Sequence, residues 1–283
     1  MTFITRFAPS PTGPLHLGHA YSALLAHDMA LAKGGVFLLR IEDIDQSRAR
    51  PEWERQIYDD LAWLGLRWPT PVLRQSERLP TYRAALGTLW QSGLLYPCTC
   101  SRRDIAQAVE APQEGGPPPF GPDGLIYPGT CRSKLDSTQP LPDTVLRLNM
   151  ARALESLPDV LGFEEAAHGA GTITLPHDML LAEVGDVVLA RQDMGASYHL
   201  SVVLDDADQH ITDVVRGEDL FTATYIHVVL QRLLGLPTPR YHHHKLIRDA
   251  AGKRLAKRDD ARAIATYRAE GKTPDDIRSL VGL

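Results

Sequence analysis

The chain has 283 residues, a mass of 31.2 kDa and a formal net charge of −5, from 30 Lys and Arg against 35 Asp and Glu. Its 43% hydrophobic and 23% charged residues are ordinary for a globular protein, which excludes a wholly disordered or fibrous chain. Because the net charge is negative, binding to a polyanion requires a local basic patch. The sequence has no apolar run near the roughly 20 residues of a membrane helix and no signal-peptide core, which predicts a cytoplasmic protein that does not bind membranes.

The first forty residues predict a strand, a helix and a second strand. Residues 2–7 alternate in polarity and precede a proline-rich loop that cannot stay helical. We expect a helix to begin at Pro14, with Thr12 or Gly13 near its N-cap, and to end at the glycine pair before the second strand. The continuous apolar run at 36–41 is typical of a parallel strand buried on both faces. This order indicates a βαβ unit and an α/β fold.

Two further helices and a long loop follow the βαβ unit. Pro51 opens one helix with apolar residues every three to four positions, and the stretch from Leu79 to Leu89 repeats the pattern. Nine of the residues at 110–124 are Gly or Pro, which predicts a surface loop without regular structure, inside an insertion.

A second half of the sheet is predicted towards the C-terminus. Residues 202–204 and 211–215 have strand character, and 222–234 reads as the helix behind them. No internal repeat is present.

The strongest local signal is His16-Leu17-Gly18-His19, at the start of the first predicted helix. Two imidazoles three positions apart share a helix face, and Gly18 removes a side chain so that a flat base or sugar can approach the backbone. The N-terminus of a helix binds phosphate, and histidines there can stabilise a triphosphate as pyrophosphate leaves. The structural alternative is a pair of surface histidines near a helix start.

A basic stretch at residues 240–262 offers a partner for this helix start. It contains eight Lys or Arg against three Asp, a local balance of +5. Lys253, Arg254 and Lys257 lie in what reads as a flexible loop, where a lysine can reach a polyphosphate as a point charge. Taken alone, a basic loop is more often a solvated surface.

The three cysteines point to a metal. Cys98 and Cys100 are too close in an extended segment for a relaxed disulfide. With Cys131 they supply three soft ligands, whereas tetrahedral zinc takes four, and no histidine lies between Cys100 and Cys131. The fourth ligand must therefore be another residue type, and the alternative is three buried free cysteines.

Together these segments resemble a known family. FAPSPTGPLHLGHA, at residues 7–20, resembles the HIGH signature of class I aminoacyl-tRNA synthetases of the glutamyl and glutaminyl branch, and GKRLAKRD, at 252–259, resembles the KMSKS signature. RIEDID, VRGEDL and YPGTC also match that branch and follow in the expected order. Two positions depart from the pattern: Arg254 stands for the usual first lysine and Ala256 for the usual serine.

The resemblance implies a Rossmann-type class I catalytic domain with an inserted zinc-containing subdomain. It implies one structural Zn²⁺ per chain, with Tyr127 completing the three-cysteine site. The implied divisions are residues 1–96 and 186–240 for the two halves of the Rossmann domain, 97–185 for the zinc-binding and tRNA-contacting insertion, and 241–283 for the KMSKS-like loop and a helical segment.

A glutamate site is expected at the carboxyl ends of the strands, where open α/β sheets bind ligands. Glutamate needs an anion for its ammonium and about two cationic groups for its carboxylates, and Glu42, Arg6 and Arg216 meet that demand. The resemblance gives the glutamate site as Arg6, Ala8, Ser10, Glu42, Tyr198 and Arg216, the ATP site as His16, Gly18, His19, Arg254 and Lys257, and the catalytic groups as His16, His19 and Lys257. The alternatives are an ordinary ion pair at Arg216 and a core tyrosine at Tyr198.

The resemblance implies a ligase that activates L-glutamate with ATP and Mg²⁺, without tRNA, to glutamyl-adenylate. Because only 24 residues follow Asp259, below the roughly 50 of an independent domain, we expect no anticodon-binding domain. This narrows the resemblance to the short paralogues of glutamyl-tRNA synthetase that transfer glutamate to the queuosine base in the tRNA(Asp) anticodon. We expect a monomer that holds tRNA phosphates with the basic stretch and with Arg102, Arg103 and Arg132, more weakly in salt.

Two other readings remain open from the sequence. A truncated glutamyl-tRNA synthetase would charge the 3′ end of tRNA instead. A non-catalytic, zinc-containing tRNA-binding module would keep the fold alone, with Arg254 and Ala256 as signs of lost activity.

Overall fold

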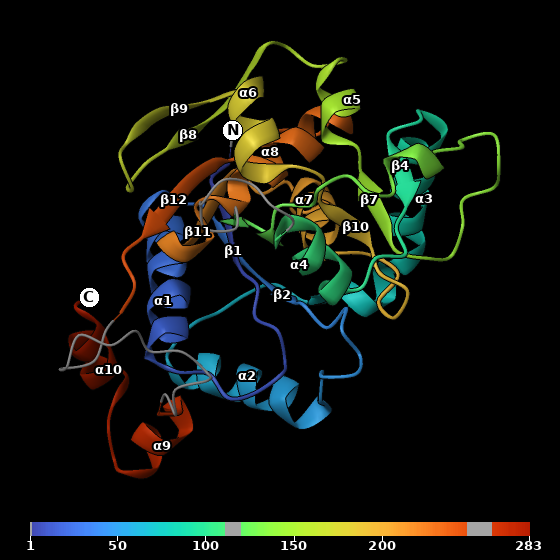
Figure 1. Cartoon of the computed structure of the whole chain (residues 1–283). Helices are drawn as coiled ribbons and strands as arrows, with labels where there is room; N and C mark the ends of the chain where they lie inside the picture. The colour runs from blue at the N-terminus through green and yellow to red at the C-terminus, as the bar shows by residue number, and fades with distance from the viewer. Residues whose placement is uncertain (1, 111–119, 248–261) are drawn as a thin grey trace.

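The computed structural model describes residues 2–110, 120–247 and 262–283. A parallel sheet lies at its centre with helices on both faces, and a smaller antiparallel sheet lies to one side (Figure 1). Among the described residues, no helix is both long and apolar enough to cross a membrane.

The predicted βαβ unit is present. Strands β1 (Ile4–Phe7) and β2 (Val36–Ile41) pair in parallel and are joined by helix α1 (Leu17–Ala32). The expected helix start was wrong, because α1 begins at Leu17 and its N-cap is His16. A distant segment holds the preceding residues extended: His16 forms an antiparallel bridge with Ala263, and the Leu15 carbonyl accepts a hydrogen bond from the Ile264 amide.

The next two predicted helices are also present. Helix α2 (Pro51–Trp63) begins at its proline, and helix α3 (Leu79–Gln91) buries Tyr82, Leu86 and Leu89. Between them, β3 (Leu73–Arg74) adds a short parallel strand to β2, and a 3₁₀ turn (Gln75–Arg78) leads into α3.

The second half of the sheet begins beside β1. Strand β11 (Asp213–Gly217) lies next to β1, where the Thr212 amide donates to the Ile4 carbonyl at 3.0 Å. It pairs in parallel with β12 (Arg240–His244), and helix α8 (Ala223–Leu233) connects them. The predicted strand at 211–215 and helix at 222–234 are therefore confirmed, with slightly shifted ends.

The predicted strand at 202–204 was wrong, because these residues belong to helix α7 (Tyr198–Asp208). Ser197 caps this helix by accepting a hydrogen bond from the Leu200 amide. The helix packs against α3, α8 and β10, so Val202 and Val203 are buried although they lie on different sides of it. A short apolar run cannot distinguish a strand from a helix buried on several faces.

The middle of the chain forms the smaller sheet and the segments around it. Strands β4 (Leu95–Pro97) and β10 (Val188–Ala190) flank β7 (Leu146–Leu148) in antiparallel order. The other elements here are α4 (Arg102–Glu110), β5 (Phe120–Gly121), β6 (Gly124–Leu125), a 3₁₀ turn (Arg132–Lys134), α5 (Met150–Leu154), β8 (Val160–Glu165), β9 (Gly171–Pro176), α6 (His177–Met179) and a π-helical turn (Leu180–Val184). Of these, β8 pairs in parallel with β12 and antiparallel with β9, so both strands extend the sheet of β11 and β12.

The prediction of an irregular loop over residues 110–124 was wrong at both ends of that range. Helix α4 extends to Glu110, and the pair β5–β6 forms a tight hairpin whose Gly124 has a positive φ. The hairpin turn uses the same Gly and Pro residues that predicted a loop. Residues 111–119 lie outside the described residues.

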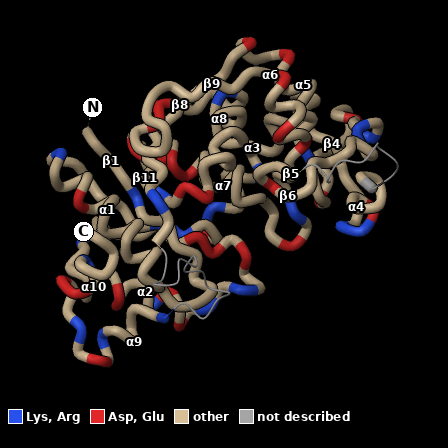
Figure 2. Tube along the Cα trace, turned by 60° about the vertical axis from the view of Figure 1, so that its left-hand side comes forward, with Lys and Arg blue, Asp and Glu red and all other residues tan. Residues whose placement is uncertain are grey.

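The C-terminal helices pack back on the first helix. Helices α9 (Ile264–Ala269) and α10 (Pro274–Val281) lie near α1 and α2 in both views (Figures 1 and 2). Ile277 and Val281 are buried against α1, and Arg278 pairs with Asp28 at 2.6 Å. At the N-terminal end of α1, Ala263 and Ile264 pair with His16 and Leu15, next to the helix cap.

Candidate active site

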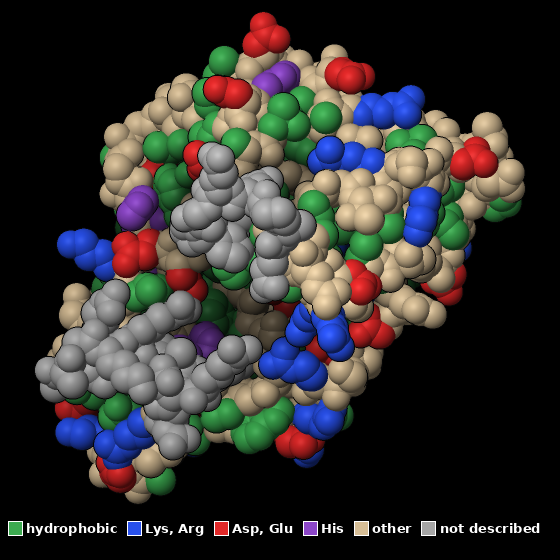
Figure 3. Space-filling view, viewed as in Figure 1, with side chains coloured by type: hydrophobic (Ala, Val, Ile, Leu, Met, Phe, Trp, Pro, Cys, Tyr) green, Lys and Arg blue, Asp and Glu red, His purple; other side chains and the backbone are tan. Residues whose placement is uncertain are grey.

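One cavity of about 430 Å³ opens at the carboxyl ends of β1, β2 and β11, beside the start of α1. Figure 3 shows the surface hollowed near the centre of this face, with a histidine side chain at the edge. The predicted residues that line it are Arg6, Ala8, His16, Gly18, His19, Glu42, Tyr198 and Arg216.

A second cavity of about 430 Å³ adjoins the first. It is lined by Ser10 and shares Ala8, Glu42 and Tyr198 with its neighbour. The structure therefore brings Ser10 beside the other predicted glutamate contacts. Of the remaining predictions, Arg254, Ala256 and Lys257 lie outside the described residues.

The two histidines at the start of α1 have a defined tautomer. The Gly18 amide donates to His16 Nδ1 at 3.1 Å, and the His16 amide donates to His19 Nδ1 at 3.2 Å. An imidazole nitrogen that accepts a hydrogen bond carries no proton, so each neutral ring is protonated at Nε2. The rings stack with centroids 3.8 Å apart.

Gly18 is needed for this stack as well as for access to the backbone. A Cβ at position 18 would lie 3.1 Å from the His16 ring. The helix start therefore presents both imidazoles, together with the dipole of α1, to the cavity.

Beneath the cavity floor, buried charges hold Arg6. Asp206 accepts two hydrogen bonds from Arg6, at 2.9 and 3.2 Å, and one from Arg40 at 2.6 Å. Burial alone would raise the pKa of Asp206, but the two guanidiniums outweigh it and lower the pKa to about 2. Asp206 is therefore ionised and fixes Arg6 in one orientation.

Glu42 is the acidic group at the cavity wall. Its side chain is 9% exposed and accepts a hydrogen bond from Arg40 at 3.1 Å. Burial raises the pKa of Glu42 even though Arg40 and Arg6 oppose the change. At neutral pH the carboxylate is suited to bind a substrate ammonium.

Arg216 lies across the cavity at the end of β11. Its guanidinium donates to His243 Nε2 at 3.1 Å, to the Leu220 carbonyl at 3.1 Å and to Thr224 Oγ1 at 2.6 Å. The alternative interpretation, an ordinary surface ion pair, does not fit, because Arg216 is only 6% exposed and is held by neutral acceptors among the described residues. Arg216 forms no direct ion pair within the described residues, so a carboxylate entering the cavity could pair with it.

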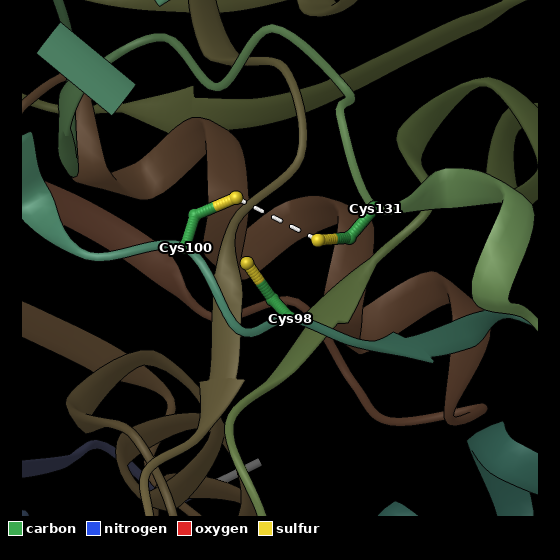
Figure 4. A group of neighbouring side chains, drawn as sticks. All are labelled: Cys98, Cys100 and Cys131. Atoms are coloured by element: carbon green, nitrogen blue, oxygen red, sulfur yellow. Dashed lines mark hydrogen bonds between the residues drawn. The ribbon is translucent and has the colours of Figure 1, made fainter. Parts of the chain in front are cut away.

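The three cysteines, shown in Figure 4, form a separate cluster with Tyr127 between β4 and the turn after β6. Cys100 Sγ lies 3.6 Å from Cys131 Sγ and 3.2 Å from the Tyr127 hydroxyl, and Cys98 Sγ lies 3.5 Å from that hydroxyl. The three sulfur atoms lie within 4.8 Å of one another.

These spacings fit a tetrahedral zinc. With Zn–S bonds of about 2.3 Å, the edges of the tetrahedron are about 3.8 Å long. Hydrogen bonds from Tyr127 and Thr99 outweigh burial and lower the pKa of Cys131 to about 6, which favours the thiolate that a metal requires. The four side chains could hold Zn²⁺ without moving far.

The predicted phosphate-binding arginines lie next to this cluster. Arg102 and Arg103 are exposed on α4, whereas Arg132 pairs with the buried Asp186 at 2.6 Å. Of the three, Arg132 is thus already neutralised within the protein.

Comparison with known proteins decides the family. The model for the catalytic domain of class I tRNA synthetases (E and Q) matches residues 2–283. Glutamyl-Q tRNA(Asp) synthetase of Rhodobacter capsulatus is 66% identical over 284 residues, covering 99% of this chain and 100% of the relative. The protein of the same name from Nocardia farcinica is 41% identical, covering 98% of this chain and 82% of the relative.

This chain belongs to the glutamyl-Q tRNA(Asp) synthetases. It is therefore a class I tRNA synthetase-like ligase, as predicted.

Solved structures agree with the predicted α/β class I synthetase fold. A glutamate tRNA ligase from Elizabethkingia meningosepticum, in complex with its amino acid, matches all of this chain with a TM-score of 0.75 and 27% identity. The chain spans 61% of that protein. Methionyl-tRNA synthetase of Mycobacterium tuberculosis, at 12% identity and a TM-score of 0.59, covers 99% of this chain and shows the shared fold alone.

Several residues at the site of this glutamyl-Q tRNA(Asp) synthetase family member were not predicted from the sequence. Ser22 lies four positions after Gly18, so helical spacing could have placed it at the cavity. Its hydroxyl lies 2.7 Å from His244 Nε2, and both residues line the cavity. Asp206 lies in an acidic segment after an apolar run and gives no local signal of burial, and its partners Arg6 and Arg40 are more than 160 positions away.

Proposed function

We propose that this protein activates L-glutamate with ATP, without tRNA, to glutamyl-adenylate, and then transfers the glutamate to the queuosine base of tRNA(Asp). The observation that carries the proposal is the single cavity that gathers Glu42, Arg6 and Arg216 beside the His16–His19 helix start. The name of the relative at 66% identity supports the choice of acceptor.

In the proposed activation step, Glu42 holds the glutamate ammonium while Arg6 and Arg216 hold carboxylates. A carboxylate oxygen attacks the α-phosphorus of ATP, a new P–O bond forms, and the bond to pyrophosphate breaks. The Nε2–H groups of His16 and His19 donate to the phosphate oxygens as charge moves to the leaving group. We assign Lys257 the same role and Arg254 an ATP contact, with Mg²⁺ bound to the triphosphate.

In the proposed transfer step, a hydroxyl oxygen of queuosine attacks the acyl carbon of glutamyl-adenylate and AMP leaves. The basic groups Arg102 and Arg103 are exposed for contact with RNA phosphates. Such contacts weaken as salt displaces them, so transfer should be more salt-sensitive than activation.

We further propose that Cys98, Cys100, Tyr127 and Cys131 bind one structural zinc, which stabilises an inserted subdomain at residues 97–185. Residues 1–96 and 186–240 would then be the two halves of the catalytic domain, and 241–283 the signature loop with its helical segment. Zinc supplies a cross-link here, since all four proposed positions are occupied by protein groups.

The deciding experiment incubates the protein with labelled glutamate, ATP and paired tRNA(Asp) samples that contain or lack queuosine. We expect glutamate to enter only the queuosine-containing tRNA. Equal incorporation into both samples would instead support charging of the 3′ end.

Glutamate-dependent exchange of pyrophosphate into ATP, measured without tRNA, tests the activation step separately. Exchange by the wild type is expected, together with a much higher KM for glutamate in Glu42→Gln and an unchanged KM in Glu52→Gln, which changes an exposed residue of α2. An intact wild-type protein with no exchange, with or without tRNA, would leave only a binding module and refute the proposal.

A further inference from the structure

Three buried histidines form a connected group beside Arg216, and neither step of the proposed reaction uses them. His199, His227 and His243 are 7%, 2% and 1% exposed. They come from helices α7 and α8 and strand β12, so the fold and not the local sequence brings them together. Buried imidazoles need partners for both ring nitrogens, and these partners define their tautomers.

The first connection runs from Arg216 to a buried carboxylate. Arg216 Nε donates to His243 Nε2 at 3.1 Å, so the His243 proton must be on Nδ1. Nδ1 lies 2.5 Å from Glu165 Oε2. Glu165 Oε1 accepts hydrogen bonds from the amides of Ala167, His168 and His243, which hold the carboxylate in place.

The second connection is longer. Arg216 Nη1 lies 3.3 Å from His227 Nδ1, which must accept because guanidinium groups only donate. His227 Nε2 then donates to His199 Nδ1 at 3.2 Å, and His199 Nε2 faces Asp123 Oδ1 at 3.7 Å. Asp123 lies in the turn of the β5–β6 hairpin.

These contacts use most of the hydrogen-bonding capacity of Arg216. A guanidinium has five N–H donors. Nε and one N–H of Nη1 go to histidines, and Nη2 goes to the Leu220 carbonyl and to Thr224 Oγ1. Within the described residues, one N–H of Nη1 is left for a ligand.

The environment keeps the two histidines that touch Arg216 neutral. Burial, with the Arg216 charge adding to it, lowers the pKa of His227 well below 6.5 and the pKa of His243 to about 4. A neutral ring can accept from the guanidinium, whereas a protonated one would repel it.

We propose that Glu165–His243 and Asp123–His199–His227 are two positioning relays that orient the Arg216 guanidinium, leaving one N–H directed to a carboxylate of the amino-acid substrate. This inference rests on the proposed role of Arg216 in glutamate binding. The carboxylates set the histidine tautomers, and the tautomers set the arginine, as second partners do for ligating histidines elsewhere. Asp123 thereby links the hairpin of the middle segment to the amino-acid site.

The test compares variants that remove or keep the accepting atom. His243→Leu removes it, whereas His243→Gln places Oε1 near the position of Nε2. In the exchange assay with tRNA(Asp) present, we expect the leucine variant to raise KM for glutamate about tenfold or more, as for a lost hydrogen bond to a charged group. KM for ATP should stay within about twofold, and the glutamine variant should recover most of the loss.

His242→Leu is the matched control, because His242 neighbours His243 on β12 and its side chain points to the opposite face. We expect its KM for glutamate to stay near the wild-type value. Equal losses in the leucine and glutamine variants, a parallel rise in KM for ATP, or no change in either would overturn the proposal.

A second variant keeps the test decisive if His243→Leu does not fold. Asp123→Asn changes a side chain that is 27% exposed on a hairpin turn, away from the core. A rise of about threefold in KM for glutamate supports the second relay, and an unchanged KM overturns it. If the wild type neither binds glutamate in calorimetry nor catalyses exchange, the proposed function fails instead of the relays.

Discussion

Asp206 gives the sharpest test of the buried charges beneath the site. Its side chain is 9% exposed and binds both Arg6 and the fully buried Arg40. Replacing it by Asn keeps the shape but removes the carboxylate that Arg6 and Arg40 share, although Arg40 keeps its ion pair with Glu42. Breaking a buried ion pair from one side costs about 3–5 kcal/mol, so we expect Asp206→Asn to lose that much free energy of unfolding.

The assay is urea unfolding followed by circular dichroism. With an m-value of about 3 kcal/mol/M, the midpoint should fall by roughly 1 to 2 M. Asp208→Asn is the matched control on the same helix, because the Asp208 side chain is 53% exposed where it pairs with Arg78. An exposed pair contributes about 0–1 kcal/mol.

Acid titration checks the same carboxylate independently. The pKa of Asp206 is lowered from 3.8 to about 2, which corresponds to a contribution on the order of 2 kcal/mol. Because the folded state has the lower pKa, this contribution is complete above about pH 4 and is lost as pH falls through 2. Equal midpoints for Asp206→Asn and Asp208→Asn, or the same acid-dependent loss in Asp206→Asn as in the wild type, would refute the reasoning.

Three further predictions concern the backbone, the Glu42 carboxylate and the metal. Gly35→Ala should destabilise the fold in thermal melts, because its Cβ would lie 2.0 Å from the Phe3 carbonyl oxygen. Gly87→Ala in α3, whose Cβ would have nothing within 4 Å, should stabilise the fold by about 0.5–1 kcal/mol. A melting temperature that is higher for Gly35→Ala than for Gly87→Ala would contradict both expectations. Because burial raises the pKa of Glu42, KM for glutamate should rise on acidification at a higher pH than an ordinary glutamate allows, and Glu42→Gln should have a high KM with no such acid limb. Metal analysis should find about one zinc per chain in the wild type and much less in Cys100→Ala. The zinc content of Tyr127→Phe should be nearly unchanged, because water can replace the phenol as the fourth ligand. Wild-type protein that takes up no zinc would exclude the site.

Local patterns were sufficient for much of the catalytic half. The βαβ unit, the helix that opens at Pro51 and the helix over 222–234 are present as predicted, because each shows a clear apolar period and a proline or turn signal at its ends. The cavity likewise collects Arg6, Glu42 and Arg216, since the carboxyl ends of parallel strands meet at one edge.

Two of the errors share one physical cause, which is contact between distant segments. The first helix begins at Leu17 and not at Pro14 because residue 263 pairs with His16. The run at 202–204 is helical because three other elements cover it, which no local pattern records.

By itself, the sequence determined the βαβ start, the family signatures and the kinds of side chain that the site would need, because these depend on order and spacing along the chain. Only the tertiary structure decided that Asp206 anchors Arg6 and that His227 and His243 hold Arg216. Burial and hydrogen-bond partners set the charge and tautomer of those groups, and both depend on residues that meet only in the folded chain.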